Sequence, residues 1–443
     1  MDKEIFRSWA GVHASKSWSF KPESIGELQN LFTLSNSNGV VPRGLGRSYG
    51  DQALNSGGGV VTIEKLSNTQ EILISDDGSV SVSAGISYGD LLKTVLKNGW
   101  IIPVVPGSRF ITIGGAIAAD VHGKNHFQKN SLSAHILELE ILIANGTVVT
   151  CNRSSEPELF WATIGGLGLT GVILRALIKL DQIQSTLFEV RSEKFSDFDQ
   201  LLSSMEASTK THSYSVAWLD LLTRNKPGRG ILQSAELVSE QTPMLEYGTG
   251  RRLTIPRVSP INCINNASCR IFNEFKFRKH PPSTLFRQIS IQDFLHPLDQ
   301  IGGWNHLYGE RGFFQWQVVI PEKEISLLKE IVATLGDLPM VPTLSVLKRL
   351  GSESLSYLSF CKPGWTLAVD FPFSEKFSRR FLDKFDAKIA AVGGRVYLAK
   401  DGGLDPKFLH EMYPKLRKWQ EVKKQYDPNN TWQSNFSRRL LLT

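Results

Sequence analysis

A glycine-rich loop near the N-terminus constrains the fold more than any other stretch of the sequence. It lies between two short apolar runs, residues 39–41 and 59–63, which are both predicted to be strands. Three glycines within seven positions allow the backbone to turn tightly and to approach a ligand closely. The loop consists of Arg43, Gly44, Leu45, Gly46, Arg47, Ser48, Tyr49, Gly50 and Asp51.

Two properties of this loop suit a phosphate group. Successive backbone N–H groups in a glycine-rich turn can form a nest that binds an anion. The side chains of Arg43 and Arg47 add permanent positive charge. A hairpin turn with solvent-facing arginines is the alternative for the loop taken by itself, because short motifs have low specificity.

Size and charge narrow the class of protein. The 443 residues are enough for two or three domains. The net charge of +7 comes from scattered basic residues, which could attract an anionic ligand or an acidic membrane face, or could be ordinary surface charge. No basic arm, zinc pattern or RNA-binding signature is present, so we expect no nucleic-acid partner.

Cysteines and apolar runs give further expectations. The four cysteines form no CxxC pair and no His cluster joins them, so we expect reduced thiols and no metal site. Residues 1–6 lack the order of a signal peptide. No apolar run approaches the roughly 18–20 residues that span a bilayer. We expect a cytoplasmic protein, and peripheral contact with the inner membrane face stays open.

A second unusual segment, residues 103–126, follows a helix that Ser87 is predicted to cap. Its middle is a run of small and apolar residues that could pack flat against a ligand, and it ends in a polar cluster. A buried small-residue helical turn is the alternative. The next strand pair is predicted to be a hairpin with a tight primed turn at Asn145-Gly146.

Residues 165–171 contain a literal G-x-G-x-x-G pattern in the wrong context for a dinucleotide-binding Rossmann domain. That motif follows a strand and opens a helix. Here it follows a predicted helix, residues 157–163, and opens a predicted strand, residues 172–180. We therefore do not expect a nicotinamide-type Rossmann domain.

The pattern changes after about residue 181, where we place a domain boundary. Residues 237–283 are rich in Pro, Asn and polar side chains with little periodicity, and we expect a long, mobile loop region there. From residue 313 to residue 398 the predicted order is β-α-β-β-α-β, the ferredoxin-like arrangement. Such an antiparallel sheet with helices on one face leaves its other face free to cover a ligand.

Taken together, the N-terminal segments resemble the FAD-binding domain of the vanillyl-alcohol-oxidase (PCMH-type) family of flavoproteins. The resemblance rests on the glycine-rich loop, Pro106-Gly107, residues 112–116, Asn145-Gly146 and residues 168–173. It implies an α+β fold. A PCMH-type FAD-binding domain of two α/β subdomains is expected at residues 1–184. A substrate domain with an antiparallel sheet covered by helices is expected at 185–395, and residues 396–443 return to the FAD domain.

Further motifs extend the resemblance over nearly the whole chain, to the decaprenylphosphoryl-ribose oxidases within that family. They include residues 217–220, 296–299, 315–317, 369–372 and 399–401. The resemblance implies FAD-dependent oxidation of the 2-hydroxyl of a polyprenylphosphoryl-β-D-ribose to the 2-keto sugar. It also implies an NAD(P)H-dependent short-chain reductase as second epimerase subunit, in cell-wall arabinan synthesis.

The same resemblance implies a flavin site formed by the glycine-rich loop and by a second set of residues. Many relatives attach FAD through a His in the loop, and Arg47 occupies the corresponding position here, so non-covalent FAD is expected. The second set is Gly107, Thr112, Ile113, Gly114, Gly115, Ala119, Asp120, Val121, His122, Ile173 and Tyr397.

Oxidising a carbinol also requires a group that takes the hydroxyl proton. Lys400, at a predicted strand end, is the first candidate if its pKa is lowered; a solvated surface charge is the alternative. His122 is a second catalytic candidate. The substrate-binding candidates are Lys124, Trp218, Gln315, Gln317, Lys348 and Lys400, with both glutamines on one strand face by period two.

Three positions depart from the related enzymes around the expected substrate pocket, namely Leu295, Thr366 and Ala368, the last of which replaces a reactive Cys. Two other functions stay open. One is an alditol or aldonolactone oxidase acting on a soluble sugar, and the other is a non-catalytic flavin-binding subunit.

Overall fold

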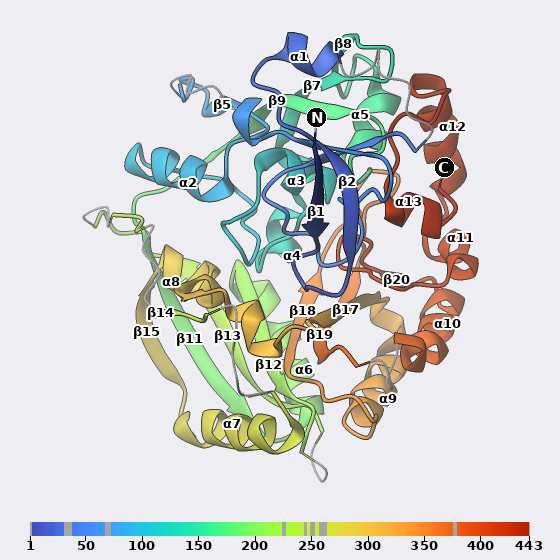
Figure 1. The fold of residues 1–443 in the computed structure, drawn as a ribbon. Helices are drawn as coiled ribbons and strands as arrows, with labels where there is room; N and C mark the ends of the chain where they lie inside the picture. The colour runs from blue at the N-terminus through green and yellow to red at the C-terminus, as the bar shows by residue number, and fades with distance from the viewer. Residues whose placement is uncertain are drawn as a thin grey trace.

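The computed structural model describes most of the chain as two stacked lobes, with the C-terminal helices along one side of both (Figure 1). The described residues are 2–30, 38–66, 72–223, 227–242, 246–248, 253–256, 264–374 and 379–442. Among these, no helix combines the length and the apolar character needed to cross a bilayer.

The first sheet places the glycine-rich loop between two parallel strands. Its order is β1 (Lys3–Arg7), β2 (Ala14–Phe20), β4 (Gly59–Thr62) and β3 (Val40–Arg43). The two strands predicted on either side of the loop are thereby confirmed. They run parallel, with Val40 opposite Gly59. A hairpin joins antiparallel strands, so the hairpin interpretation of the loop is wrong.

The second sheet and its helices complete the N-terminal lobe. Antiparallel strands follow in the order β5 (Ser79–Ser83), β9 (Val172–Lys179), β7 (Ile136–Leu142) and β8 (Val148–Asn152). The helices are α1 (Ile25–Asn30), α2 (Tyr88–Lys97), α3 (Ile113–Ala118), α4 (His126–Lys129) and α5 (Pro157–Thr163). A minor sheet pairs β6 (Trp100–Ile101) with β10 (Asp181–Gln182). The predicted cap of α2 is confirmed, because the Ser87 hydroxyl accepts the Asp90 N–H at 3.0 Å.

Two local predictions need correction or fall outside the description. Strands β7 and β8 form the predicted hairpin, but the turn is not a primed one. The Gly146 N–H donates to the Ile143 carbonyl, and Gly146 has φ 83° while Asn145 keeps a negative φ. The sequence also predicts a strand at residues 69–75. Residues 69–71 lie outside the described residues, and Ile74 forms only an isolated bridge to Val80.

The second lobe is built on one eight-stranded sheet. Its order is β15 (Leu285–Ser290), β11 (Leu187–Phe195), β13 (Arg229–Leu237), β12 (Tyr214–Asp220), β18 (Leu344–Leu350), β19 (Gly364–Pro372), β17 (Phe313–Ile320) and β20 (Arg395–Val396). The last four strands, with α9 (Ile325–Leu335) and α10 (Asp383–Ala391), confirm the ferredoxin-like prediction. Short elements nearby are β14 (Leu253–Thr254), β16 (Ile301–Gly302) and α8 (Ile291–Leu295).

The other half of this sheet repeats the same order of elements. Strands β11, β12, β13 and β15, with α6 (Phe198–Thr211) and α7 (Asn266–Lys279), again follow the β-α-β-β-α-β order. The two units join edge to edge where Trp218 of β12 lies opposite Val346 of β18. The expectation of a loop throughout residues 237–283 is wrong for α7. That helix buries only Cys269 and Asn273, so no apolar stripe signalled it.

The C-terminal segment packs against the N-terminal lobe. It contains α11 (Leu409–Met412), α12 (Leu416–Tyr426) and α13 (Asn435–Arg439). The indole N–H of Trp419 donates to the Ala162 carbonyl at 3.0 Å, and the Val40 N–H donates to the Thr431 carbonyl at 2.7 Å. The guanidinium of Arg439 binds both carboxylate oxygens of Asp51, at 2.8 and 3.0 Å, and lies 3.0 Å from Asp401.

We expect Arg439→Ala to lower the free energy of unfolding by about 3–5 kcal/mol, because it leaves two buried carboxylates without their cation. The side chains of Asp51 and Asp401 are 6% and 1% exposed. Urea titration checks this. The matched control is Lys418→Ala, which removes an ion pair to Glu158 with both side chains about half exposed and should change stability little. Equal effects of the two substitutions would contradict the prediction.

Candidate active site

A hollow between the two N-terminal sheets has the features of a dinucleotide cradle. Glycine-rich backbone lines it on opposite sides, with Gly44 on one side and Gly168 and Gly171 on the other. Seven of the predicted cofactor residues border it, namely Arg43, Gly44, Ser48, Gly114, Gly115, Ala119 and Ile173. Prediction from sequence omitted Gln52, Ala53 and Ala399, which also border the hollow.

The cradle is built for close backbone approach. A Cβ on Gly44 would lie 2.2 Å from the Thr112 Oγ1, and one on Gly168 would lie 2.8 Å from the Pro42 ring. Thr112 caps α3, because its hydroxyl accepts the Gly115 N–H at 3.1 Å.

The backbone of the loop leaves donors free to bind an anion. The N–H groups of Gly44, Leu45 and Gly46 donate to no other residue within the described chain. Three consecutive N–H donors beside Arg43 fit the pyrophosphate of a flavin dinucleotide. The residues present therefore fit FAD.

The remaining residues of the loop brace the cradle. The Arg47 guanidinium lies 3.9 Å from the centroid of the Trp9 ring. A Cβ on Gly50 would lie 1.9 Å from the Asp401 carbonyl oxygen, so this position tolerates only glycine. The carboxylate of Asp51 accepts hydrogen bonds from the Arg439 guanidinium.

Four further predicted cofactor residues lie away from the hollow. Ile113 and Val121 are buried in the core of the N-terminal lobe, and Gly107 is exposed. Asp120 is fully buried and accepts hydrogen bonds from Ser131 at 3.0 Å and Ser359 at 2.5 Å. None of these four borders the hollow.

Tyr397 lies close to the cradle without lining it. Its hydroxyl donates to the carbonyl of Ala119 at 2.8 Å, and Ala119 does border the hollow. The Tyr397 ring also lies 5.3 Å from the His122 ring. Tyr397 therefore connects the cradle to the polar cluster described next.

Polar side chains gather on the face of the eight-stranded sheet that the helices α9 and α10 leave free. The strand registers put Gln315, Gln317, Lys348, Thr366 and Asp370 on this face. Trp316 and Val318 point to the opposite face, into the core with the helices. The predicted sharing of one face by the two glutamines is confirmed.

His122 is held in one neutral form by this face. The Gln317 Nε2 donates to the Thr366 hydroxyl at 3.2 Å and lies 3.0 Å from the His122 Nε2. Because Nε2 accepts, the ring proton is on Nδ1, which is buried and has no partner within the described residues. Burial, and then the charge of Lys348, holds the pKa of His122 well below its usual value.

Lys400 lies against the glycine-rich loop. Its Nζ is 3.5 Å from the centroid of the Tyr49 ring, on the glycine-rich loop. Burial lowers the pKa of Lys400 to about 7, while Asp370 raises it and Lys348 lowers it further. A substantial fraction of Lys400 is therefore neutral at physiological pH.

Asp370 was not predicted as a site residue. Burial raises its pKa to about 7, and Gln315 Nε2 donates to its Oδ1 at 2.6 Å. Its Oδ2 is buried without a partner in the described chain. A carboxylate in the otherwise apolar strand 367–371 was the available sequence signal.

The site carries an excess of positive charge. Burial is the main cause that lowers the pKa of Lys124 to about 7, of Lys348 to about 8 and of His126 to about 3. Lys348 also lowers the pKa values of Lys124 and His126, so these groups lie close together. The side chains of Lys124, Lys348 and Lys400 all have intermediate exposure. Such clustered cations suit an anionic ligand.

The other predicted substrate residues and the three departures complete the picture. Lys124 donates to the carbonyl of Phe294. Trp218 lies on the same sheet face as Lys348 and is covered by Lys276, whose Nζ is 4.3 Å from the ring centroid. Ala368 lies opposite Gln317 on this face, whereas Leu295 is buried in the N-terminal core.

Family models match two parts of the chain. Residues 18–152 match an FAD binding domain. Residues 318–440 match D-arabinono-1,4-lactone oxidase.

Three relatives place the chain more closely. Decaprenylphosphoryl-beta-D-ribose oxidase of Mycolicibacterium smegmatis is 34% identical over 434 residues, which are 95% of this chain and 93% of the relative. A Streptomyces coelicolor protein described as "Uncharacterized protein in mprA 5'region" is 30% identical over 80% of this chain and 100% of its own length. Cytokinin dehydrogenase 2 of Arabidopsis thaliana is 34% identical over 36% of this chain and 32% of its own.

The cradle and the FAD-domain match together confirm the cofactor and the α+β, PCMH-type fold. The resemblance inferred from the motifs is confirmed over nearly the full length of both chains. The protein belongs to the decaprenylphosphoryl-β-D-ribose oxidase family of FAD-dependent oxidoreductases.

Proposed function

We propose that this protein oxidises the 2-hydroxyl of a polyprenylphosphoryl-β-D-ribose to the 2-keto sugar, as the first half of epimerisation to the arabinose form. One observation carries the proposal: a lysine with a pKa of about 7 lies beside the cradle, next to clustered cations. Lys400 supplies the base and Lys348 with Lys124 supplies the phosphate site. The related mycobacterial enzyme acts on a substrate of this name.

The residues divide the chemical work. Bound FAD supplies the acceptor for the hydride that leaves the carbinol carbon. Neutral Lys400 takes the hydroxyl proton at Nζ, and Asp370 stabilises the resulting ammonium. The Nδ1–H of His122 donates to the substrate oxygen, and Gln317 keeps that tautomer in place.

The remaining assignments support this scheme. Residues 1–184 bind FAD and residues 185–395 bind substrate. Residues 396–443, which include Lys400, return to the FAD domain. Gln315 and Gln317 contact the sugar, and Trp218 forms a wall of the pocket. A separate NAD(P)H-dependent short-chain reductase completes the epimerisation, and the protein contacts a membrane peripherally to reach its substrate.

A second candidate has its own support. The match of residues 318–440 to D-arabinono-1,4-lactone oxidase favours oxidation of a soluble sugar or lactone. Anaerobic mixing with farnesylphosphoryl-ribose and with free lactones separates the two. Bleaching of the flavin absorbance by the lipid-linked sugar supports the proposal, whereas bleaching only by lactones supports the alternative.

Replacing the base should abolish turnover without loss of cofactor. We expect Lys400→Ala to slow flavin reduction by roughly 100- to 10,000-fold, because a positioned base contributes about that much. Stopped-flow absorbance with farnesylphosphoryl-ribose measures the rate, and the visible spectrum measures bound FAD. Lys407→Ala, at an exposed lysine paired with Asp405, is the control. Full activity of the Lys400→Ala variant would show that Lys400 is not the base.

The pH dependence follows from the direction of the pKa shifts. Neutral Lys400 is the active form, so the rate of flavin reduction at saturating substrate should rise with pH and level off above about 7. Affinity should fall above about 8, where Lys348 loses its charge.

Asp370→Asn tests which group is responsible for the rising limb, because Asp370 also has a pKa of about 7. Removing the charge of Asp370 should shift the rising part of the pH–rate profile to lower pH, because Asp370 raises the pKa of Lys400. If the limb disappears in this variant, Asp370 and not Lys400 is the titrating group.

The flavin should be removable, because Arg47 occupies the loop position at which many family members carry a linking His. We expect acid precipitation to leave the yellow colour in the supernatant, with FAD identified by chromatography. A yellow pellet would mean a covalent link and would overturn this prediction. Trypsin digestion of such a pellet would identify the linked residue.

A further inference from the structure

Helix α7 exposes a contiguous apolar surface. Ile271, Phe272 and Phe275 are 71%, 60% and 61% exposed. Residues three and four positions apart on a helix are neighbours, so the three side chains form one patch. Three large apolar side chains exposed together are uncommon on a protein surface unless something binds there.

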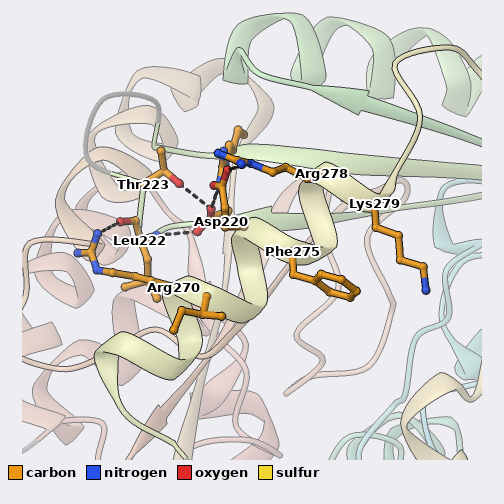
Figure 2. Close-up of a pocket in the computed structure, with 10 residues that line it drawn as sticks. Asp220, Leu222, Thr223, Arg270, Phe275, Arg278 and Lys279 are labelled. Carbon is orange, nitrogen blue, oxygen red and sulfur yellow. Dashed lines mark hydrogen bonds and ion pairs between the residues drawn. The ribbon is translucent and has the colours of Figure 1, made fainter.

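A hollow of about 990 Å³ adjoins this patch, between α7 and the ends of β12 and β13. Figure 2 shows Phe275 and Lys279 projecting from one side of the helix, away from Asp220 at the base of the hollow. Ile271 and Phe275 form its apolar rim, while Arg270, Arg278 and Lys279 form its charged rim.

The acidic groups in the hollow are neutralised internally. Asp220 receives hydrogen bonds from the Arg229 guanidinium at 2.8 and 3.0 Å, and from Asn273 at 2.8 Å. Glu274 binds Arg229 at 2.5 Å and also pairs with Arg278. Among the described residues that line the hollow, no carboxylate is therefore left without a cation.

Positive charge remains at the rim. Within the described residues, Arg270 binds only the Leu222 carbonyl and the Asn266 amide oxygen, both at 2.6 Å, and Lys279 has no carboxylate partner. An apolar patch bordered by basic side chains complements an anionic lipid surface, with the apolar groups entering the acyl boundary.

We propose that the outer face of α7, defined by Ile271, Phe272, Phe275 and Lys279, docks this protein on an anionic lipid bilayer. The position of α7 relates this membrane contact to the proposed substrate site. On its inner side Lys276 covers Trp218, which shares a sheet face with Lys348. A lipid-linked sugar extending from the bilayer would enter this face past α7. That step rests on the proposed function, whereas the docking itself does not.

Sedimentation of the full-length FAD-containing protein with vesicles tests the proposal. Vesicles of equal parts phosphatidylglycerol and phosphatidylcholine should bind the protein, and phosphatidylcholine alone should bind it much less. We expect the double variant Phe272→Ser, Phe275→Ser to lower the partition coefficient by roughly tenfold or more, because two exposed aromatic side chains no longer enter the acyl region. Lys279→Glu should weaken binding to the anionic vesicles and should make that binding less sensitive to salt.

Phe286→Ser is the matched control. Phe286 is 65% exposed on β15, and its register opposite Arg191 places it on the other face of the sheet from α7. This variant should bind vesicles as the unaltered protein does. All variants should retain bound FAD, because every substituted side chain is exposed.

Specific outcomes would overturn the proposal. Unchanged vesicle binding by the double variant would exclude α7 as the docking surface. Equal binding to both vesicle types would exclude charge complementarity. A dimer that dissociates in the double variant, without vesicle binding by either form, would show that a second copy covers the face. If the unaltered protein binds vesicles but does not turn over farnesylphosphoryl-ribose, that result counts against the proposed function and not against the docking surface.

Discussion

The contact between Arg439 and two carboxylates holds the proposed chemistry together. One carboxylate, Asp51, ends the glycine-rich loop, and the other, Asp401, directly follows Lys400. Gln52 adds hydrogen bonds of 2.6 Å to the carbonyls of Leu398 and Asp401. Two segments about 350 positions apart are thereby fixed to each other. This is why Lys400 lies on the ring of Tyr49.

That fixed position also explains the altered acidity of Lys400. A flexible lysine would turn its ammonium to bulk water and keep its usual pKa. Here the chain on either side is clamped, so the amine stays over an aromatic ring with Asp370 as the main compensating charge. The same contacts that hold these segments together therefore keep the Lys400 amine partly neutral near pH 7.

The sequence predicted what depends on local chemistry. The Ser87 cap, the strands beside the loop and the ferredoxin-like unit follow from capping residues, glycines and apolar periodicity. It did not predict parallel pairing of β3 with β4, because pairing depends on segments distant in sequence. Helix α7 was missed since it buries so little apolar surface. Asp370 was missed because its meaning comes from the Lys400 that faces it.

The repeat within the large sheet places α7 in an unusual position. In the unit of β17 to β20, both helices cover the face opposite the proposed substrate site. In the other unit α6 does the same, since its Leu201 and Met205 join the core with Leu232. Helix α7 instead lies on the side of Trp218, where Lys276 contacts that ring. Helix α7 buries only Cys269 and Asn273, so its apolar residues Ile271, Phe272 and Phe275 remain on its outer side.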